Sequence, residues 1–187
     1  MIKVNEIFYS IQGEGEKAGT PTVFIRLAGC NLNCPFCDTN FIEYTETTEE
    51  DILYMVQKYP SETICFTGGE PLLQDLRKCL YLLEDYDLHL ETNGTILIPE
   101  EFEFTTLSPK AFNVLEVNLH ITDSIKFLCG IPQWEEIIEK YLPLVSGTAY
   151  LQPLSLDEEL TKKAYEYVMQ HPRLKLSLQL HKYINVK

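Results

Sequence analysis

The sequence predicts an α/β fold in which mostly parallel strands form a partial, open TIM-like barrel of about six strands. Short apolar runs alternate along the chain with segments of helical periodicity, which is the pattern of βαβ units. Polar and glycine-containing segments follow directly after several of the expected strands, as they do at the ligand-binding edge of α/β enzymes. A complete eight-stranded barrel needs about 250 residues. This chain has 187, so the barrel is expected to stay open.

The expected strands are short, apolar and bounded by polar or turn-forming residues. They lie at 7–11, 22–28, 63–66, 88–91, 105–107, 124–129, 148–151 and 174–180. Helices are expected at 73–83, 134–141 and 157–169. One more begins at Thr47 or Thr48, where Glu50 or Asp51 three residues later completes a capping pattern.

Length and composition predict a single domain over residues 1–187. Hydrophobic residues make up 45% of the chain and charged residues 23%, which is ordinary for a soluble globular protein. No apolar run approaches the ~20 residues of a membrane helix. The first six residues lack the apolar region of a signal peptide. The protein is therefore expected in the cytoplasm, without membrane association.

The charge balance bears on the kind of partner. The chain has 28 acidic and 15 basic residues, a formal net charge of −13. Proteins that bind nucleic acid normally carry a basic patch or stripe, whereas here the Lys and Arg residues are scattered along the sequence. Direct binding of nucleic acid is therefore not expected, and a small-molecule substrate fits better.

Three of the six cysteines form a C-x3-C-x2-C pattern. Cys30, Cys34 and Cys37 lie in a short polar loop directly after the apolar run 23–28. Thiolates at such close spacing suit zinc or an iron–sulfur cluster. A closed structural site takes four protein ligands, whereas three leave one coordination position for something that reacts. From the spacing alone, a zinc knuckle with its fourth ligand elsewhere is the alternative.

The other three cysteines, Cys65, Cys79 and Cys129, lie inside apolar segments. Free cysteine there behaves as a small buried hydrophobic residue, and this is the expected role of all three. The clustered thiolates would be destroyed by oxidation, so a reducing compartment is expected.

Short segments along the whole chain carry a family resemblance. The C-x3-C-x2-C pattern resembles the radical S-adenosylmethionine (SAM) superfamily. From about residue 5 to residue 185, the chain resembles the 7-carboxy-7-deazaguanine synthase family of queuosine biosynthesis. Seven segments carry this resemblance, in the order Tyr9-Ser10-Ile11-Gln12-Gly13-Glu14-Gly15, Arg26-Leu27-Ala28-Gly29-Cys30-Asn31-Leu32, Cys37-Asp38-Thr39, Thr67-Gly68-Gly69-Glu70-Pro71, Glu91-Thr92-Asn93-Gly94-Thr95, Ser108-Pro109-Lys110 and Leu151-Gln152-Pro153-Leu154-Ser155.

The resemblance implies a lyase with the open radical SAM core. The three cysteines would hold a [4Fe–4S] cluster whose fourth iron is chelated by the amino and carboxylate groups of SAM. The reaction would convert 6-carboxy-5,6,7,8-tetrahydropterin to 7-carboxy-7-deazaguanine with loss of ammonia, and no side chain would act as catalytic acid or base. Mg²⁺ is the third cofactor implied. The partners would be an electron donor of the flavodoxin or ferredoxin type and a second copy of the chain, which could cover the open side of the barrel.

A second set of residues would hold SAM. Gly68 and Gly69 let backbone approach a ligand closely, because no Cβ intervenes. The alternative is a tight turn before a helix whose first turn includes Pro71. By the resemblance, the backbone at Gly69 meets the amino group of SAM. The ribose, adenine and carboxylate of SAM would meet residues after two later strands, namely Ser108, Pro109, Lys110, Gln152, Pro153, Leu154 and Ser155.

The substrate would meet the turn that contains Ile11, Gln12, Gly13 and Glu14. A pterin edge displays alternating hydrogen-bond donors and acceptors, which an amide and a carboxylate together can read. By the resemblance, Thr67 beside the SAM glycines also touches the substrate.

Three more side chains have two interpretations each. Arg26 needs an anion if buried, either the substrate carboxylate in bidentate geometry or an internal Glu. By the resemblance, the Thr39 hydroxyl coordinates the Mg²⁺ that holds the substrate, whereas its alternative role is to cap a turn. His181 lies in a tail that folds over the substrate in the resembling family, although a lone histidine is more often structural.

Two rival functions share part of this pattern. A radical SAM activase, which makes a glycyl radical on a partner protein, would share the cysteine loop. It would have no use for Gln12, Glu14 and Arg26. A zinc-binding structural module would share the cysteines alone.

Overall fold

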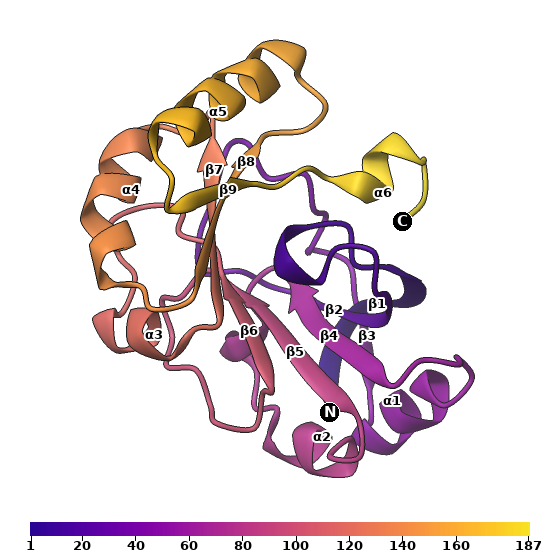
Figure 1. The fold of residues 1–187 in the computed structure, drawn as a ribbon. Helices are drawn as coiled ribbons and strands as arrows, with labels where there is room; N and C mark the ends of the chain where they lie inside the picture. The colour runs from indigo at the N-terminus through magenta and orange to yellow at the C-terminus, as the bar shows by residue number, and fades with distance from the viewer. The chain divides into compact units, whose positions relative to one another are not determined.

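The computed structural model describes all 187 residues, and strands alternate with helices through most of the chain (Figure 1). The chain divides into two compact units. The first consists of Met1–Ser10, Pro21–Thr92 and Ile98–Thr105, and the second of Ile11–Thr20, Asn93–Leu97 and Thr106–Lys187. No helix has both the length and the apolar character needed to cross a membrane. The expectation of one domain stays a prediction.

The first unit contains five strands in the order β3-β1-β2-β4-β5. β3 pairs antiparallel with β1, while β2, β4 and β5 are parallel neighbours. The strands are β1 (Ile2–Ile11), β2 (Pro21–Leu27), β3 (Thr45–Thr47), β4 (Thr63–Gly68) and β5 (Asp87–Thr92). The helical segments are α1 (Glu49–Val56), the 3-10 turn η2 (Pro71–Leu73) and α2 (Arg77–Leu82).

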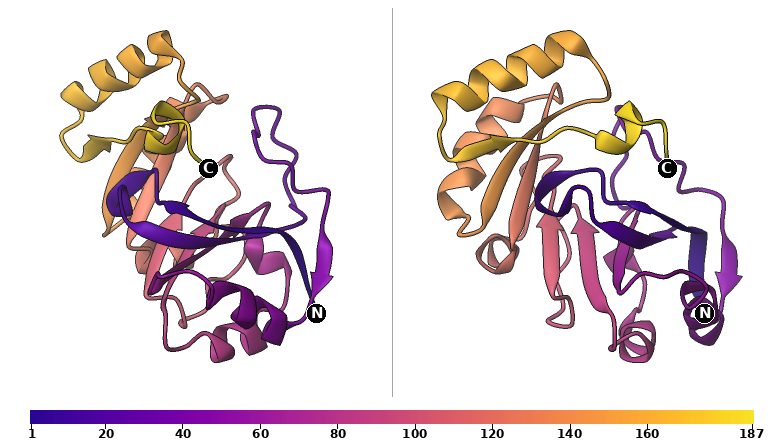
Figure 2. Two further views of the ribbon diagram at one scale, coloured as in Figure 1. Left: turned by 90° about the vertical axis from the view of Figure 1, so that its right-hand side faces the viewer. Right: turned by 45° about the vertical axis from the view of Figure 1, so that its right-hand side comes forward.

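In the second unit the strand order is β6-β7-β8-β9, and every neighbouring pair is parallel. The strands are β6 (Phe104–Leu107), whose last two residues belong to this unit, β7 (Ser124–Cys129), β8 (Thr148–Pro153) and β9 (Leu174–Leu176). The helical segments are η1 (Gly15–Lys17), α3 (Glu116–Ile121), α4 (Trp134–Tyr141), η3 (Leu142–Leu144), α5 (Glu158–Gln170) and α6 (Leu180–Tyr183). α4 packs on β7, and α5 packs on β8 and β9 (Figure 2).

The predicted fold class is confirmed. Strands and helices alternate, and the ladders between β2, β4 and β5 and between β6 and β9 are parallel. β3 and β9 stand at the two ends of the strand order, as in an open sheet. There are nine strands instead of about six. One of the additional strands is β3, a polar three-residue strand too short to give a periodic pattern.

Three predicted elements were wrong in extent. The strand expected at 7–11 already begins at Ile2. The helix expected at 73–83 begins only at Arg77, because Gln74 is extended and the Asp75 carboxylate accepts the Arg77 N–H at 3.2 Å. The strand expected at 174–180 ends at Leu176, and the chain enters α6 at Leu180. The sequence prediction also missed α3, which is only six residues long.

Other local predictions were confirmed. α1 begins after Thr48, whose hydroxyl oxygen accepts the Asp51 N–H at 3.1 Å. Cys65, Cys79 and Cys129 are buried. Burial removes these three thiols from solvent, as expected for small apolar side chains.

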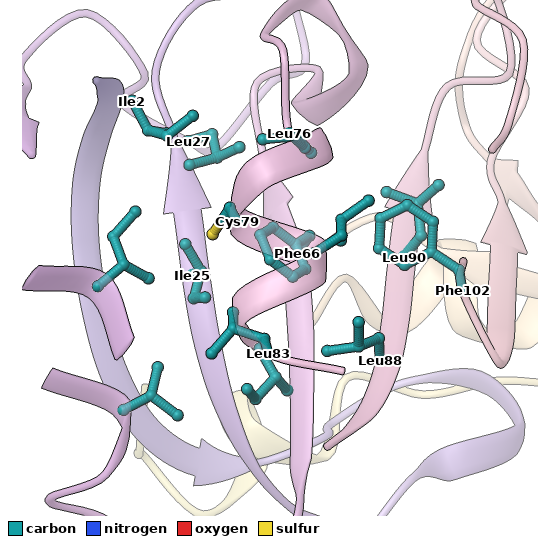
Figure 3. Close-up of a cluster of buried hydrophobic side chains, with 14 of the residues drawn as sticks. Ile2, Ile25, Leu27, Phe66, Leu76, Cys79, Leu83, Leu88, Leu90 and Phe102 are labelled. Atoms are coloured by element: carbon teal, nitrogen blue, oxygen red, sulfur yellow. The ribbon is translucent and has the colours of Figure 1, made fainter. Parts of the chain in front are cut away.

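An apolar core lies between the helices and the sheet of the first unit (Figure 3). Ile25, Phe66 and Leu90 extend from β2, β4 and β5, and Cys79 on α2 and Leu83 directly after it belong to the same cluster. All five are nearly or fully buried. This core fixes the two strands whose ends carry the cysteine loop and the Gly68–Gly69 turn.

Replacing Leu83 with Ala should therefore lower the free energy of unfolding by about 2–5 kcal/mol, because it deletes buried methyl groups and leaves a cavity. Leu83 is fully buried, whereas Leu73 is 46% exposed. Leu73→Ala is the matched control and should change stability by less than about 1 kcal/mol. Urea denaturation followed by circular dichroism measures both. If Leu73→Ala lowered the free energy of unfolding as much as Leu83→Ala, Leu73 would have to be buried, in contradiction to its position before the observed start of α2.

Candidate active site

The cysteine loop directly follows β2 in the first unit. Cys30, Cys34 and Cys37 are free thiols, the first two half-buried and the third exposed. The Cys37 N–H donates to the Cys34 carbonyl at 3.1 Å and closes a turn. The Leu32 N–H donates to Cys30 Sγ at 3.4 Å, which favours the thiolate. Burial raises the pKa of Cys30, and the negative charge of Glu70 adds to this rise.

The thiols fit an iron–sulfur cluster by their chemistry. A bound metal deprotonates a thiol outright, so the raised pKa of Cys30 is no obstacle. The chain has no group of three or more His, Cys, Asp and Glu side chains gathered to hold one metal ion. A [4Fe–4S] cluster places its cysteine ligands on separate iron atoms, so its ligands need not converge on one point. Three free thiols in one loop are a suitable donor set.

Glycine is required at both positions of the turn after β4. Gly68 has φ +128°, and a Cβ on it would lie 2.2 Å from the carbonyl oxygen of Leu27. A Cβ on Gly69 would lie 1.9 Å from the carbonyl oxygen of Gly29. The Glu70 N–H donates to the same Gly29 carbonyl at 2.9 Å. Close packing against the end of β2 therefore accounts for both glycines, and the contact of Gly69 with SAM stays a prediction.

Glu70 ends the same turn and belongs to the segment Thr67–Pro71 that carries the family resemblance, but the sequence analysis predicted no role for its side chain. Its side chain is fully buried. The carboxylate accepts the Thr92 hydroxyl at 2.9 Å and the Leu72 N–H at 3.2 Å. The Thr92 bond ties the end of β5 to the glycine turn, and the Leu72 bond caps the start of η2.

Arg26 forms the internal ion pair that the sequence left open. Its Nε donates to Glu6 Oε1 at 3.0 Å, and both side chains are partly exposed. Its Nη1 lies 3.5 Å from Thr39 Oγ1. Thr67, which was also predicted to contact the substrate, is the register partner of Arg26 in the ladder between β2 and β4. A guanidinium has five N–H donors, so the pair with Glu6 uses only one edge of it.

Thr39 offers a hydroxyl oxygen, which is the kind of hard ligand that Mg²⁺ prefers. Its side chain is half-buried and lies beside Arg26. This hydroxyl could serve as one oxygen ligand of a magnesium ion whose other ligands would come from a bound anion and water. The role of Thr39 as that ligand stays a prediction.

In the second unit, the turn Gln12–Glu14 carries a carboxylate, that of Glu14, which forms an ion pair. The Glu14 N–H donates to Gln12 Oε1 at 3.1 Å, which fixes the turn. Glu14 Oε2 pairs with the ammonium of Lys126, and Glu14 Oε1 accepts the Gln179 side-chain N–H at 2.7 Å. The Lys126 side chain is 6% exposed and that of Glu14 is 16% exposed.

The charge state of Glu14 follows from these contacts. Burial by itself would raise the pKa of the carboxyl group. The Lys126 ammonium and hydrogen bonds from Lys126, Gln179 and Gln152 outweigh burial, and they hold the pKa of Glu14 at about 2. Glu14 is thus a fixed anion at neutral pH.

The C-terminal tail lies on the turn that carries Glu14. The Leu180 N–H donates to the Gly13 carbonyl at 2.9 Å, and a Cβ on Gly13 would lie 2.0 Å from His181 Nδ1. Ser177 Oγ accepts the Gly15 N–H at 2.9 Å and donates to Gln152 Oε1 at 2.9 Å. His181 therefore packs directly against Gly13, in agreement with a tail that folds over this turn.

The segments predicted to hold SAM in this unit lie at strand ends. The buried Ser108 hydroxyl donates to the Lys126 carbonyl at 2.9 Å, and Lys110 Nζ donates to Ser108 Oγ at 2.5 Å. Pro153 ends β8, and the Leu154 N–H after it donates to the Cys129 carbonyl at 3.2 Å. Ser155 has φ +55°, a left-handed conformation that is uncommon for residues other than glycine and typical of ligand-binding segments.

The cysteine loop and the α/β fold of mostly parallel strands together define a radical SAM protein. A sequence model described as the radical SAM superfamily matches residues 24–141. The 7-carboxy-7-deazaguanine synthase of Bacteroides thetaiotaomicron is 41% identical, with 100% of both chains covered. The synthase of a Synechocystis species is 34% identical over 98% of this chain and 93% of its own. This chain belongs to the 7-carboxy-7-deazaguanine synthase family of that superfamily.

A solved structure agrees with this assignment. The crystal structure of QueE from Escherichia coli superposes with a TM-score of 0.84 at 28% sequence identity. The match covers 96% of this chain and 94% of the solved chain.

Several residues of the second unit were missed by the sequence analysis. Lys126, Ser177 and Gln179 all contact the predicted turn or its neighbours. Lys126 had a recognisable signal, because it is the only charged residue in the apolar strand β7. A lone lysine in a buried strand indicates a buried acidic partner. Ser177 and Gln179 had no such signal, since the segment was predicted as strand.

Replacing Lys126 with Met should destabilise the protein by about 3–5 kcal/mol at pH 7, because it leaves the Glu14 carboxylate buried without its ammonium partner. The double variant Glu14→Gln/Lys126→Met removes both charges and should recover most of the loss. Urea denaturation measures both variants. A Lys126→Met variant as stable as wild type would contradict the ion pair.

The same pair predicts a pH dependence. The pKa of Glu14 is held at about 2, below its ordinary value of 4.5. Its contribution to stability is therefore full above about pH 4.5 and is lost as the pH falls toward 2. The double variant should lack this part of the acid destabilisation, which the same denaturation series measures.

Proposed function

We propose that this protein converts 6-carboxy-5,6,7,8-tetrahydropterin to 7-carboxy-7-deazaguanine with loss of ammonia, as a lyase of queuosine and 7-deazapurine biosynthesis. One observation carries the proposal. Three free thiols at C-x3-C-x2-C spacing follow β2 in a chain that matches 7-carboxy-7-deazaguanine synthases over its full length. When bound, the [4Fe–4S] cluster and SAM supply the radical chemistry.

The chain's own residues bind and orient these groups. Cys30, Cys34 and Cys37 hold the cluster, and the backbone at Gly69 receives the amino group of SAM. The rest of SAM is bound in the second unit by Ser108, Pro109, Lys110, Gln152, Pro153, Leu154 and Ser155. Two hydrogen bonds support this SAM-binding role, because they order polar groups at strand ends. They join Lys110 to Ser108 and Ser177 to Gln152.

The substrate is bound by two sets of residues. Ile11, Gln12, Gly13 and Glu14 read the pterin edge, and the fixed negative charge of Glu14 supports this role. Arg26 and Thr39 bind the carboxylate end, Thr39 through Mg²⁺, while Thr67 contacts the ring. Glu6 holds Arg26 by its Nε, so the other N–H groups of the guanidinium can bind a carboxylate.

The partners follow from the same chemistry. A flavodoxin or ferredoxin supplies the electron, and the cluster thiolates require a reducing compartment, which supports a cytoplasmic location. A second copy of the chain forms a homodimer. Exposed apolar side chains at and beside α3, among them Leu115, Val117 and Ile121, support this assembly. The net charge of −13 argues against nucleic acid as a ligand.

Mass analysis of the products tests the function. Protein reconstituted with iron and sulfide, and incubated with SAM, reductant and the tetrahydropterin, should release 7-carboxy-7-deazaguanine. Cys30→Ala should lose SAM cleavage and most of its iron, because two thiolates cannot hold the cluster in place. Cys65→Ala is the matched control and should keep both. Iron retained by Cys30→Ala, or lost from Cys65→Ala, would refute the ligand assignment.

The magnesium site has its own test. Thr39→Ala should lose the stimulation of turnover by Mg²⁺ while the visible absorption of the cluster and the affinity for SAM stay as in wild type. Thr39→Ser, which keeps the hydroxyl oxygen, should retain most of the stimulation. If Thr39→Ala responds to Mg²⁺ as wild type does, the metal is held elsewhere.

A further inference from the structure

One polar atom beside Glu14 has no partner within the protein. Gln179 Oε1 is buried and makes no hydrogen bond. Leaving a buried acceptor unpaired costs free energy, so such an atom needs an explanation. Its position next to the proposed substrate turn points to a ligand, and the inference therefore rests on the proposed function.

The orientation of the amide is fixed by its neighbour. Gln179 Nε2 donates to Glu14 Oε1 at 2.7 Å. The opposite orientation would place the amide oxygen against a carboxylate that is ionised at neutral pH, which is repulsive. The N–H group must therefore face Glu14, and the oxygen atom must be the unpaired one.

Gln179 is also held in place by the backbone around it. Its carbonyl accepts the Lys182 N–H at 3.0 Å, and the next residue, Leu180, donates to Gly13 at 2.9 Å. Two residues before it, Ser177 Oγ bonds both Gly15 and Gln152. The acceptor oxygen thus sits on a segment bonded on both sides to the Glu14 turn and its neighbours, and its position is set before a ligand arrives.

The pterin offers the donors that this arrangement lacks. Its pyrimidinone ring carries three N–H bonds on one edge, one at N3 and two on the 2-amino group. A carboxylate can accept two of them side by side, as it does from a guanidinium. The third N–H, on the 2-amino group, then needs a separate acceptor, which a buried amide oxygen beside the carboxylate supplies.

We infer that Gln179 is a specificity-determining residue whose Oε1 accepts a hydrogen bond from the 2-amino group of the substrate, next to Glu14. The site is then built to require that group. A ligand with oxygen at this position would leave Gln179 Oε1 unpaired and would also place an acceptor against it. Sites that bury a polar group for one substrate discriminate strongly against analogues that cannot pair with it.

The test compares two ligands in each variant. 6-Carboxypterin carries the 2-amino group and 6-carboxylumazine carries oxygen in its place, and both are fluorescent, so equilibrium binding to the reconstituted protein with SAM can be titrated directly. Gln179→Met removes the amide at similar length and should weaken 6-carboxypterin on the order of 10-fold. Binding of 6-carboxylumazine should change by less than about 3-fold, or improve. Gln170→Met, at an exposed glutamine on α5, is the matched control and should change neither.

The ratio of the two affinities decides the outcome. If Gln179→Met merely loosens the tail, both ligands lose affinity equally, the ratio stays as in wild type, and the inference is wrong. An unchanged affinity for 6-carboxypterin would equally show that another group or water satisfies Oε1. Conversion of the tetrahydropterin by wild type, read by mass, separates this from the proposed function. If wild type forms product while the ratio is unchanged in the variant, only the role assigned to Gln179 fails.

Discussion

The second unit depends on a single buried carboxylate. Glu14 is bonded to Lys126 on β7 and to Gln179 in the tail, and Gln152 on β8 helps to hold its charge. Burying a carboxylate and an ammonium is costly unless the remaining hydrogen-bonding capacity is also satisfied. Removing either partner alone leaves the other charge unpaired, which destabilises the fold strongly. The turn, β7 and the tail are therefore coupled through the charge of Glu14.

The first unit is governed by a different constraint, which is the close approach of two backbones. The ends of β2 and β4 are so near that neither Gly68 nor Gly69 can carry a Cβ. Glu70 fixes this turn by accepting the Thr92 hydroxyl. The result is that the cysteine loop and the glycine turn leave adjacent strands with a set spacing, before any cofactor is bound. Arg26 is positioned in a similar way by its bond to Glu6.

The sequence was most informative where chemistry and spacing are local. The cysteine loop, the cap at Thr48 and the buried cysteines could all be predicted, because each depends on neighbours in the chain. Strands β7 and β8 were predicted by their apolar runs. The start of α2 was not, since it depends on the side chains of Gln74 and Asp75.

The candidate site was predicted less completely, because its supporting contacts join distant parts of the chain. Glu6 and Gln179 each meet a predicted site residue through a contact that no local pattern encodes. The lone lysine of β7 indicates an acidic partner but does not identify it as Glu14. Arg26 shows the limit clearly. Its need for an anion could be deduced from burial on a strand, but the choice between an internal Glu and a substrate carboxylate could not.

The bond between Glu14 and Gln179 joins residues that are 165 positions apart. Contacts of such long sequence separation carry a large loop-closure entropy and are slow to form during folding. The turn at residues 12–15 therefore reaches its final hydrogen bonding only after residue 179 has been synthesised and has folded back onto it. Until then, Glu14 Oε1 lacks the hydrogen bond that the Gln179 side chain donates in the folded protein. The order of synthesis thus makes the hydrogen bonding around Glu14 one of the last features that the newly made protein acquires.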